Sequence, residues 1–212
     1  MANVIWNNDI ILSIVPTDYD LHTATVDVTV IVGANILQFE GAGASDGLGF
    51  DFTNVALVRQ GDSTNTNILV NGDFSQPSQG KSFNNYDDIL GWNGSQIEVG
   101  FGKIYNAWPN GIQVCELDSD SNFEITQILT FDSNFQVISS PPAPCLPSKL
   151  FSTPQFILRF DWAPNTVGTD DLLTSQANIL FNNVVIGSIV PDNTTNGVNI
   201  DAAFAFYYDP CR

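Results

Sequence analysis

The chain has 212 residues, of which 43% are hydrophobic and 14% are charged, and its 23 acidic and 6 basic side chains give a net charge of −17. This length and apolar content predict one sizeable core, or one domain with a fragment. The charge argues against nucleic-acid partners, because phosphate binding requires clustered Lys and Arg, and against anionic membrane surfaces. No apolar run approaches the roughly 18 residues that a membrane-spanning helix requires, so no membrane insertion is expected.

Short segments rich in Val, Ile, Phe and Thr recur along the chain, separated by clusters of Gly, Asn, Asp and Pro, which is typical of β-strands. The strands predicted in chain order are 26–32, 35–40, 52–58, 111–117, 123–129, 155–162, 179–181 and 184–186. The pairs Asn7-Asn8 and Asn182-Asn183 predict two-residue hairpin turns, because Asn tolerates positive φ. The pattern predicts an all-β fold, an antiparallel β-sandwich of the jelly-roll type.

One stretch of sequence occurs twice. Residues 3–18 match residues 178–193, with eight of 16 positions identical and four more exchanging one apolar residue for another. Chance gives only about one identity, so the repeat is genuine. Its offset of 175 residues leaves no room for two complete copies in 212 residues. The chain is therefore either a slice of a tandem array or one domain with a spare copy of one of its hairpins.

Several motifs in the middle of the chain resemble those of galactose-binding-like jelly rolls, a family that includes carbohydrate-binding modules and related cell-wall domains. They are Asn71-Gly-Asp-Phe74, Gly91-Trp92, Gln96-Ile-Glu98, Cys115-Glu-Leu-Asp118, Ile125-Thr-Gln127 and Phe160-Asp-Trp162. The motifs that close such a domain, at 33–49 and 53–57, precede these rather than follow them. The resemblance thus implies a jelly roll in rotated strand order, with closing strands in 1–62 and opening and central strands in 63–212.

This rotation leaves three interpretations open. The N-terminal strands fold back within the molecule as a circular permutant, they complete a neighbouring molecule by strand donation, or the chain is cut from an array. In strand donation, one copy of the repeated hairpin is surplus and serves a head-to-tail polymer. Donation by the N-terminus predicts that a chain lacking the residues before about Ala24 stays monomeric. The residues expected to mediate assembly are Val4, Trp6, Ile10, Ile11, Ile14, Phe181, Ile186 and Ile189.

The favoured function is accordingly a non-enzymatic subunit of an extracellular or cell-surface, pilus-like fibre whose partner is a second copy of the chain. The alternative is a carbohydrate-binding or adhesive module, in which exposed aromatic rings stack on sugars. Trp108 lies in a polar stretch and is the leading glycan-binding residue, with Tyr105 and Tyr86 beside it. Trp92 and Trp162 match positions that pack the core in the resembled family. No nucleophile–base pair or metal signature indicates an enzyme.

The remaining sites are minor. Asp118 and Asp120 alternate as calcium ligands do, without the Gly and the distal Glu of an EF-hand. The resemblance implies a structural Ca²⁺ at the position of Thr53, where Asp51 or Asp73 would have to supply the carboxylate. Otherwise no cofactor is predicted. Asn93 and Asn193 begin glycosylation triplets. Cys145 and Cys211 either form a disulfide or stay free, and Cys115 remains unpaired in both cases.

Overall fold

The computed structural model describes residues 2–14, 20–41, 50–80, 82–102, 108–117, 123–138 and 154–164, and the backbone of 177–181 and 184–189. All regular secondary structure in the described residues is β-strand, which confirms the predicted all-β class. The strands are β1 (Ala2–Trp6), β2 (Asp9–Ile14), β3 (His22–Thr29), β4 (Gly33–Gly41), β5 (Phe50–Arg59), β6 (Phe83–Ile89), β7 (Trp92–Phe101), β8 (Gln113–Glu116), β9 (Glu124–Phe131), β10 (Val137–Ile138), β11 (Gln155–Pro164), β12 (Ala177–Phe181) and β13 (Val184–Ile189).

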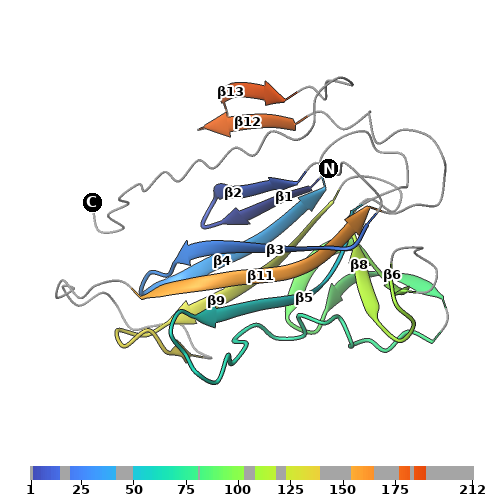
Figure 1. Ribbon diagram of the computed structural model, residues 1–212, viewed down its shortest axis with the longest axis horizontal. Helices are drawn as coiled ribbons and strands as arrows, with labels where there is room; N and C mark the ends of the chain where they lie inside the picture. The colour runs from blue at the N-terminus through green and yellow to red at the C-terminus, as the bar shows by residue number, and fades with distance from the viewer. Residues whose placement is uncertain are drawn as a thin grey trace.

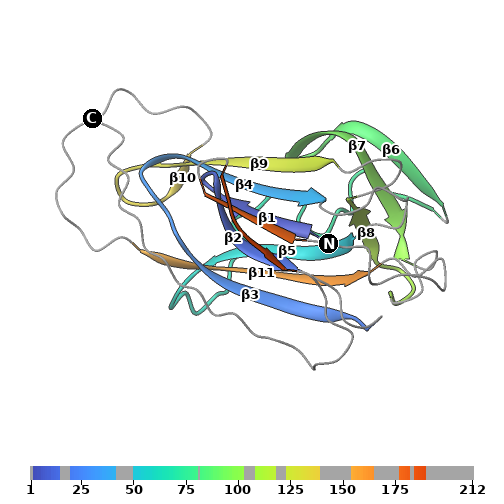
Figure 2. The ribbon, with the colours of Figure 1, turned by 90° about the horizontal axis from the view of Figure 1, so that it is seen from above.

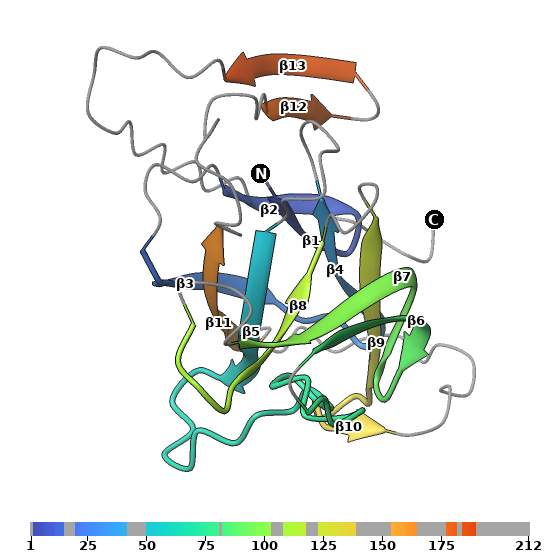
Figure 3. The ribbon, with the colours of Figure 1, turned by 90° about the vertical axis from the view of Figure 1, so that its right-hand side faces the viewer.

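Eleven strands form one antiparallel sheet in the order β2-β1-β4-β9-β7-β8-β5-β11-β3, with β10 paired to β9 and β6 to β7 (Figure 1). The sheet curls into two facing layers, as the end-on view in Figure 3 shows. Strand β7 joins the layers, because Asn93 and Gly94 pair with β9 whereas residues 98–101 pair with β8. Between these two pairings Gln96 has a φ of 60°, which bends the strand.

Strands from the two ends of the chain interleave in this sheet. β4 pairs with β9, and β5 pairs with both β8 and β11 (Figure 2). The strands of 1–62 and those of 63–164 thus share one hydrophobic core. Of the three interpretations drawn from the rotated order, folding back within the molecule describes strands β1 to β11.

Aromatic rings from both layers meet in the core. The Phe39 ring on β4 stacks on Phe52 at 4.4 Å between centroids and meets Phe160 edge-on at 5.2 Å. Trp92 is buried, and half-buried Trp162 stacks on Phe50 at 5.4 Å. Both tryptophans therefore pack the core, as expected. Offset and edge-on pairs such as these add to the burial of apolar area.

The segment 67–77 lies against β5 and requires glycine at position 72, where the two backbones approach closely. The Val55 amide donates to the Gly72 carbonyl at 2.8 Å, and a Cβ on Gly72 would come within 2.0 Å of the Val55 oxygen. Phe74 is buried, and the Trp92 indole donates to the Asn71 carbonyl at 3.2 Å. The Asn-Gly-x-Phe and Gly-Trp motifs are therefore in direct contact.

Sequence reasoning missed β6, β7 and the two-residue β10, and it placed the start of β3 four residues too late. β6 is exposed along most of its length, so its polar residues show no apolar alternation. β7 begins with Trp92 but continues through polar Asn93, Ser95 and Gln96. β3 begins at His22, before the predicted start at residue 26, and the imidazole stacks on Trp162 at 4.5 Å. Tertiary contacts rather than local periodicity determine these strands.

The central position of Phe39 predicts a large cost on truncation. Phe39→Ala should lower the free energy of unfolding by about 3–5 kcal/mol, because it removes a fully buried ring that two opposing layers contact. Urea denaturation followed by tryptophan fluorescence measures this change. The matched control is Ile128→Ala on the adjacent strand β9, since Ile128 is 57% exposed and should cost no more than about 0.5 kcal/mol. Equal losses for the two variants would contradict this description of the core.

Candidate functional site

The N-terminal hairpin, β1–β2 (residues 2–14), completes one layer of the sandwich. β1 pairs with residues 37–41 of β4, which we call the acceptor edge, from Ala2 opposite Gly41 to Trp6 opposite Leu37. Ala2 and Val4 are fully buried, and Trp6 and Ile14 are nearly so. The hairpin therefore covers the part of the core that the acceptor edge would otherwise leave open.

Polar side chains fix the hairpin on this edge. The Asn7 amide donates to the Ile36 carbonyl at 2.9 Å, and the Asn7 side-chain oxygen accepts from the Ile36 amide at 2.8 Å. The Asn7 side-chain nitrogen donates to Asn35 Oδ1 at 3.1 Å. Asn3 donates to Glu40 at 3.3 Å and accepts from Ser13 at 2.9 Å. Asn7 thus extends the β1–β4 ladder by one residue beyond the strand.

The C-terminal hairpin, β12–β13 (residues 177–189), has the same internal pairing. In the first hairpin Ala2 pairs with Ile14, Asn3 with Ser13 and Trp6 with Asp9, with a bulge between Val4 and Ile5. In the second, Ala177 pairs with Ile189, Asn178 with Ser188 and Phe181 with Val184, with a bulge between Ile179 and Leu180. Each pair and the bulge coincide at the offset of 175 residues. Bulges are specific features of a strand pair, so the second hairpin is a structural copy of the first.

The two hairpins differ in what they pair with. Among the described strands, β12 and β13 pair only with each other and form a separate two-stranded sheet. The expected assembly residues Val4, Trp6 and Ile14 are buried in the N-terminal hairpin, and Ile10 and Ile11 are half-buried. The side chains of Phe181, Ile186 and Ile189 lie outside the described part of the chain. The sequence left open whether the N-terminal hairpin docks in its own molecule or in a neighbour, and here β1 pairs with β4 of the same chain.

Three buried carboxylates lie side by side on β5, β8 and β7. Asp51 pairs with Glu116, and Glu116 pairs with Glu98, so the register places their side chains on one face. Asp51 is fully buried, and its Oδ2 accepts from the Trp108 indole at 3.3 Å. Asp51 Oδ1 has no hydrogen-bond partner in the described structure. Burial, then the charge of Glu116, raises the pKa of Asp51 well above its ordinary value.

Trp108, the leading residue of the expected glycan-binding surface, is buried. Trp108 is only 6% exposed and packs with Val114 and Ala163, so the prediction that it presents an exposed ring is wrong. Its polar neighbours in sequence gave no sign that its indole covers Asp51. Tyr86 is half-buried, and its hydroxyl accepts from Gln79 at 2.5 Å. Tyr105 lies outside the described residues.

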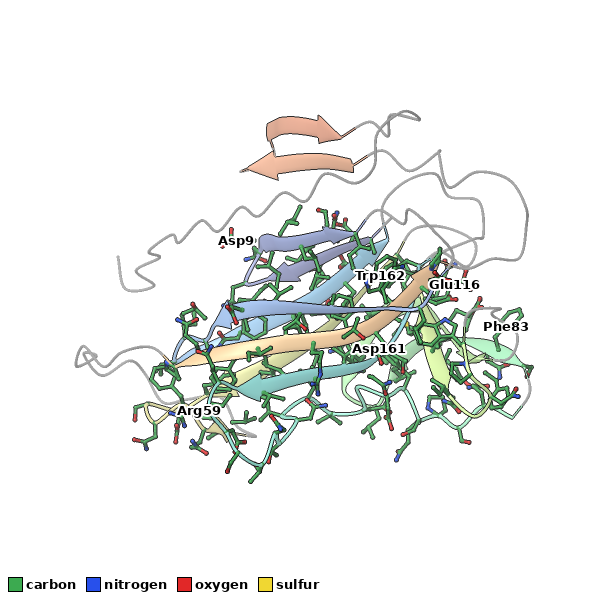
Figure 4. All side chains as sticks on the ribbon, in the orientation of Figure 1. Asp9, Arg59, Phe83, Glu116, Asp161 and Trp162 are labelled. Atoms are coloured by element: carbon green, nitrogen blue, oxygen red, sulfur yellow. The ribbon has the colours of Figure 1, made fainter. Side chains whose placement is uncertain are left out.

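A polar groove of about 720 Å³ lies elsewhere, on the outer face of β5 and β11. Asp161, labelled in Figure 4, accepts from Thr23 at 2.6 Å and from Asn54 at 2.9 Å. Arg159 lies two residues away on the same strand and is exposed, and its guanidinium makes no hydrogen bond or ion pair with any described residue. Exposed Asp73 also lines the groove. Sequence reasoning missed this site, because its residues come from four separate segments.

The other predicted sites have little structural counterpart. Asp118, Asp120, Asn193, Cys145 and Cys211 fall outside the described residues. Asn93 is exposed on β7, and Cys115 is buried and unpaired. Asp51 is buried while Asp73 is exposed, and no group of three or more His, Cys, Asp or Glu in the described segments is arranged to hold a metal ion. Calcium binding therefore stays a prediction.

Comparison of the chain with protein-family models, with curated proteins and with solved structures gives no match. The described segments contain no helix of the length and apolarity needed to cross a membrane. The two hairpins, the acceptor edge and the polar groove are therefore interpreted from their own geometry.

The buried Asp51 predicts a pH-dependent stability. A carboxyl whose pKa is raised on folding contributes stability below its ordinary pKa of 3.8, and this contribution is lost as pH rises through the raised value. Asp51→Asn removes the titrating group, so the variant should gain stability over the native chain as pH increases from about 4 to 8. Urea unfolding across this range measures the difference. A difference that does not change with pH would contradict the assignment.

Asp62 provides a control for which stability should depend on pH in the opposite direction. It is partly exposed, and hydrogen bonds from the Thr64 amide and hydroxyl lower its pKa. The stability that ionised Asp62 contributes to the folded state is present above its ordinary pKa and is lost on acidification. Asp62→Asn should therefore lose stability relative to the native chain at neutral pH, and this loss should shrink toward acid pH.

Proposed function

We propose that the chain is a non-enzymatic structural subunit that assembles head to tail by hairpin exchange. The C-terminal hairpin of one copy pairs with the acceptor edge of the next copy, in the place that β1–β2 takes within a single chain. Repetition of this contact produces a linear homopolymer, consistent with a fibre outside the cell or on its surface. Here the donor is the C-terminal hairpin, rather than the N-terminal one expected from sequence.

The observation that carries this proposal is the common register of the two hairpins. The shared pairs and the shared bulge mean that β12 can present the same backbone donors and acceptors to β4 as β1 does. Main-chain pairing of this kind gives affinity, and alternate side chains entering the core give specificity.

The residues kept in both copies support the same conclusion. Asn3 and Asn7, which bond to Glu40, Asn35 and Ile36 on β4, recur as Asn178 and Asn182. Buried Ala2 and Ile14 recur as Ala177 and Ile189. Asn3 bonds to Ser13 within the hairpin as well as to Glu40 on β4, and both Asn3 and Ser13 recur, as Asn178 and Ser188. The repeat therefore retains the residue types of the docking contacts together with those of the hairpin itself.

A cross-linking experiment tests the proposal. Asn3 lies opposite Glu40, so in the exchanged contact Asn178 of one copy would lie opposite Glu40 of the next. Paired residues on adjacent strands are close enough for a disulfide. Full-length Glu40→Cys/Asn178→Cys chains, with Cys145 and Cys211 changed to Ser, are refolded together from urea at high concentration and then oxidised. A ladder of covalent multimers on non-reducing gels is expected.

Two controls define the outcome. Asp27→Cys/Asn178→Cys places the first cysteine on β3, away from the acceptor edge, and should give no ladder. Asn3→Cys/Glu40→Cys locks the chain's own hairpin in place and should leave only monomers in sedimentation under oxidising conditions. If Glu40→Cys/Asn178→Cys gives only an intramolecular disulfide, or none, head-to-tail assembly is wrong.

The polar groove favours a second candidate function, carbohydrate binding. Its amide, hydroxyl, carboxylate and guanidinium groups match the hydrogen-bonding needs of a polyhydroxylated ligand. This site replaces Trp108 as the focus of the glycan prediction.

Arg159→Ala tests this second function. The Arg159 side chain has no polar partner among the described residues, so its removal should leave the fold intact. It should weaken glycan binding by about 1.5–3 kcal/mol, the range for a charged hydrogen bond. A glycan array followed by titration calorimetry measures the change. Arg59→Ala is the matched control, since Arg59 is exposed on β5 and does not line the groove. An array with no binding by the folded native chain would rule the function out.

A further inference from the structure

We infer that the N-terminal hairpin is a self-occluding plug that holds the folded chain in a monomeric state until it is displaced. This inference rests on the proposed function, because it concerns the same acceptor edge. It comes from the positions at which the two hairpins differ, whereas the proposed function comes from the positions at which they agree.

The first difference is a hydrogen bond. The Trp6 indole nitrogen on β1 donates to the Thr29 carbonyl at the end of β3, at 2.9 Å. This bond joins the two opposite ends of the curled sheet. The C-terminal hairpin has Phe181 at the corresponding position, and a phenyl ring has no N–H to donate. A docked C-terminal hairpin would fill the aromatic site but would leave the two ends of the sheet without this link.

The second difference is in packing. Leu12 on β2 is half-buried against the hydrophobic core, and the matching residue of the C-terminal hairpin is Gly187. Glycine leaves the space of the leucine side chain unfilled and weakens a strand through its backbone freedom. Val4 is fully buried and its counterpart is the larger Ile179, and an added methylene in a packed core generally costs stability. All three differences favour the N-terminal hairpin as occupant.

Covalent connection adds to this preference. Only residues 15–21 separate β2 from β3, so the N-terminal hairpin stays close to its own acceptor edge at a high effective concentration. A hairpin from another molecule must compete against a better-fitting occupant that cannot diffuse away. Assembly of the folded chain is therefore limited by release of β1–β2, and a factor that pulls out this hairpin would start polymerisation.

The test compares rates of exchange under native conditions. Folded Glu40→Cys/Asn178→Cys chains are mixed at neutral pH with a mild oxidant, and intermolecular disulfide formation is followed over time. A weakened plug is made by Trp6→Phe/Leu12→Gly, which gives the first hairpin the residues of the second. It should cross-link at least about tenfold faster, because both a hydrogen bond and a buried side chain favouring the closed state are lost.

A second variant leaves the plug untouched. Phe181→Trp/Gly187→Leu gives the donor hairpin the residues of the plug, so the yield of intermolecular cross-links at equilibrium should rise several-fold. Because β1–β2 is unchanged, this variant stays informative if the weakened plug unfolds. The matched control is Asp9→Val, the residue found at position 184. Asp9 is exposed at the start of β2 (Figure 4), so its replacement should not alter the rate.

The outcomes separate the inference from the proposed function. Absence of any intermolecular cross-link after refolding together from urea overturns head-to-tail assembly itself. The plug alone is overturned if ladders form after refolding but the cross-linking rate under native conditions is the same for the unmodified and weakened plugs, and the improved donor gives no higher cross-link yield. Head-to-tail assembly would then still hold. Three results together support both head-to-tail assembly and the plug. Exchange of the unmodified chain is slow under native conditions, it is faster in Trp6→Phe/Leu12→Gly, and the cross-link yield is higher in Phe181→Trp/Gly187→Leu.

Discussion

Pairing of β1 with β4 is the interaction on which the rest of the structure depends. β4 lies between β1 and β9 and carries Phe39, the ring that contacts the facing layer. Its pairing with β1 brings Val4 and Trp6 over the same core and allows the Trp6 indole to reach β3. Without β1, the acceptor edge would expose unpaired backbone groups beside open apolar surface, which invites pairing with another chain. One contact thus both closes the monomer and defines the place where a second copy would attach.

Sequence reasoning found the elements whose local pattern agrees with their environment. Strands β4, β9 and β11 alternate apolar and polar residues because one face of each packs on the core, and periodicity reveals such strands. β5 is instead buried along almost its whole length, and its apolar run Val55-Ala-Leu-Val58 reveals it. The Asn7-Asn8 turn was also predictable, since both residues adopt positive φ at 50° and 70°. β6 was not predictable in this way. Its exposed polar residues form a strand only because β7 supplies the backbone partners.

The sites were less predictable than the strands, because burial of a polar group depends on distant segments. Asp51 lies between two buried phenylalanines on β5, a pattern that suggests a solvent-facing carboxylate. The Trp108 indole covers it from a segment more than 50 residues away and supplies its one hydrogen bond. A carboxylate with an unsatisfied buried oxygen beside two further acids costs stability. Nothing in the polar sequence around Trp108 distinguishes a covering residue from an exposed sugar platform.

The C-terminal hairpin raises a physical problem that the repeat helps to resolve. An isolated two-stranded hairpin is at best marginally stable in water, because only one strand pair supports it. β12 and β13 contain Ile, Leu, Phe and Val in most positions, which favours burial over exposure. Such a hairpin would gain stability from an additional sheet edge, and under the proposed function that edge is β4 of a second copy. Both strand exchange and a tandem array provide a β4-type edge, from a second molecule or from a following domain. Phe181 lacks the indole N–H of Trp6, and Gly187 lacks the side chain of Leu12. If both hairpins compete for the β4 edge, as the proposed function requires, the N-terminal hairpin is therefore the stronger competitor.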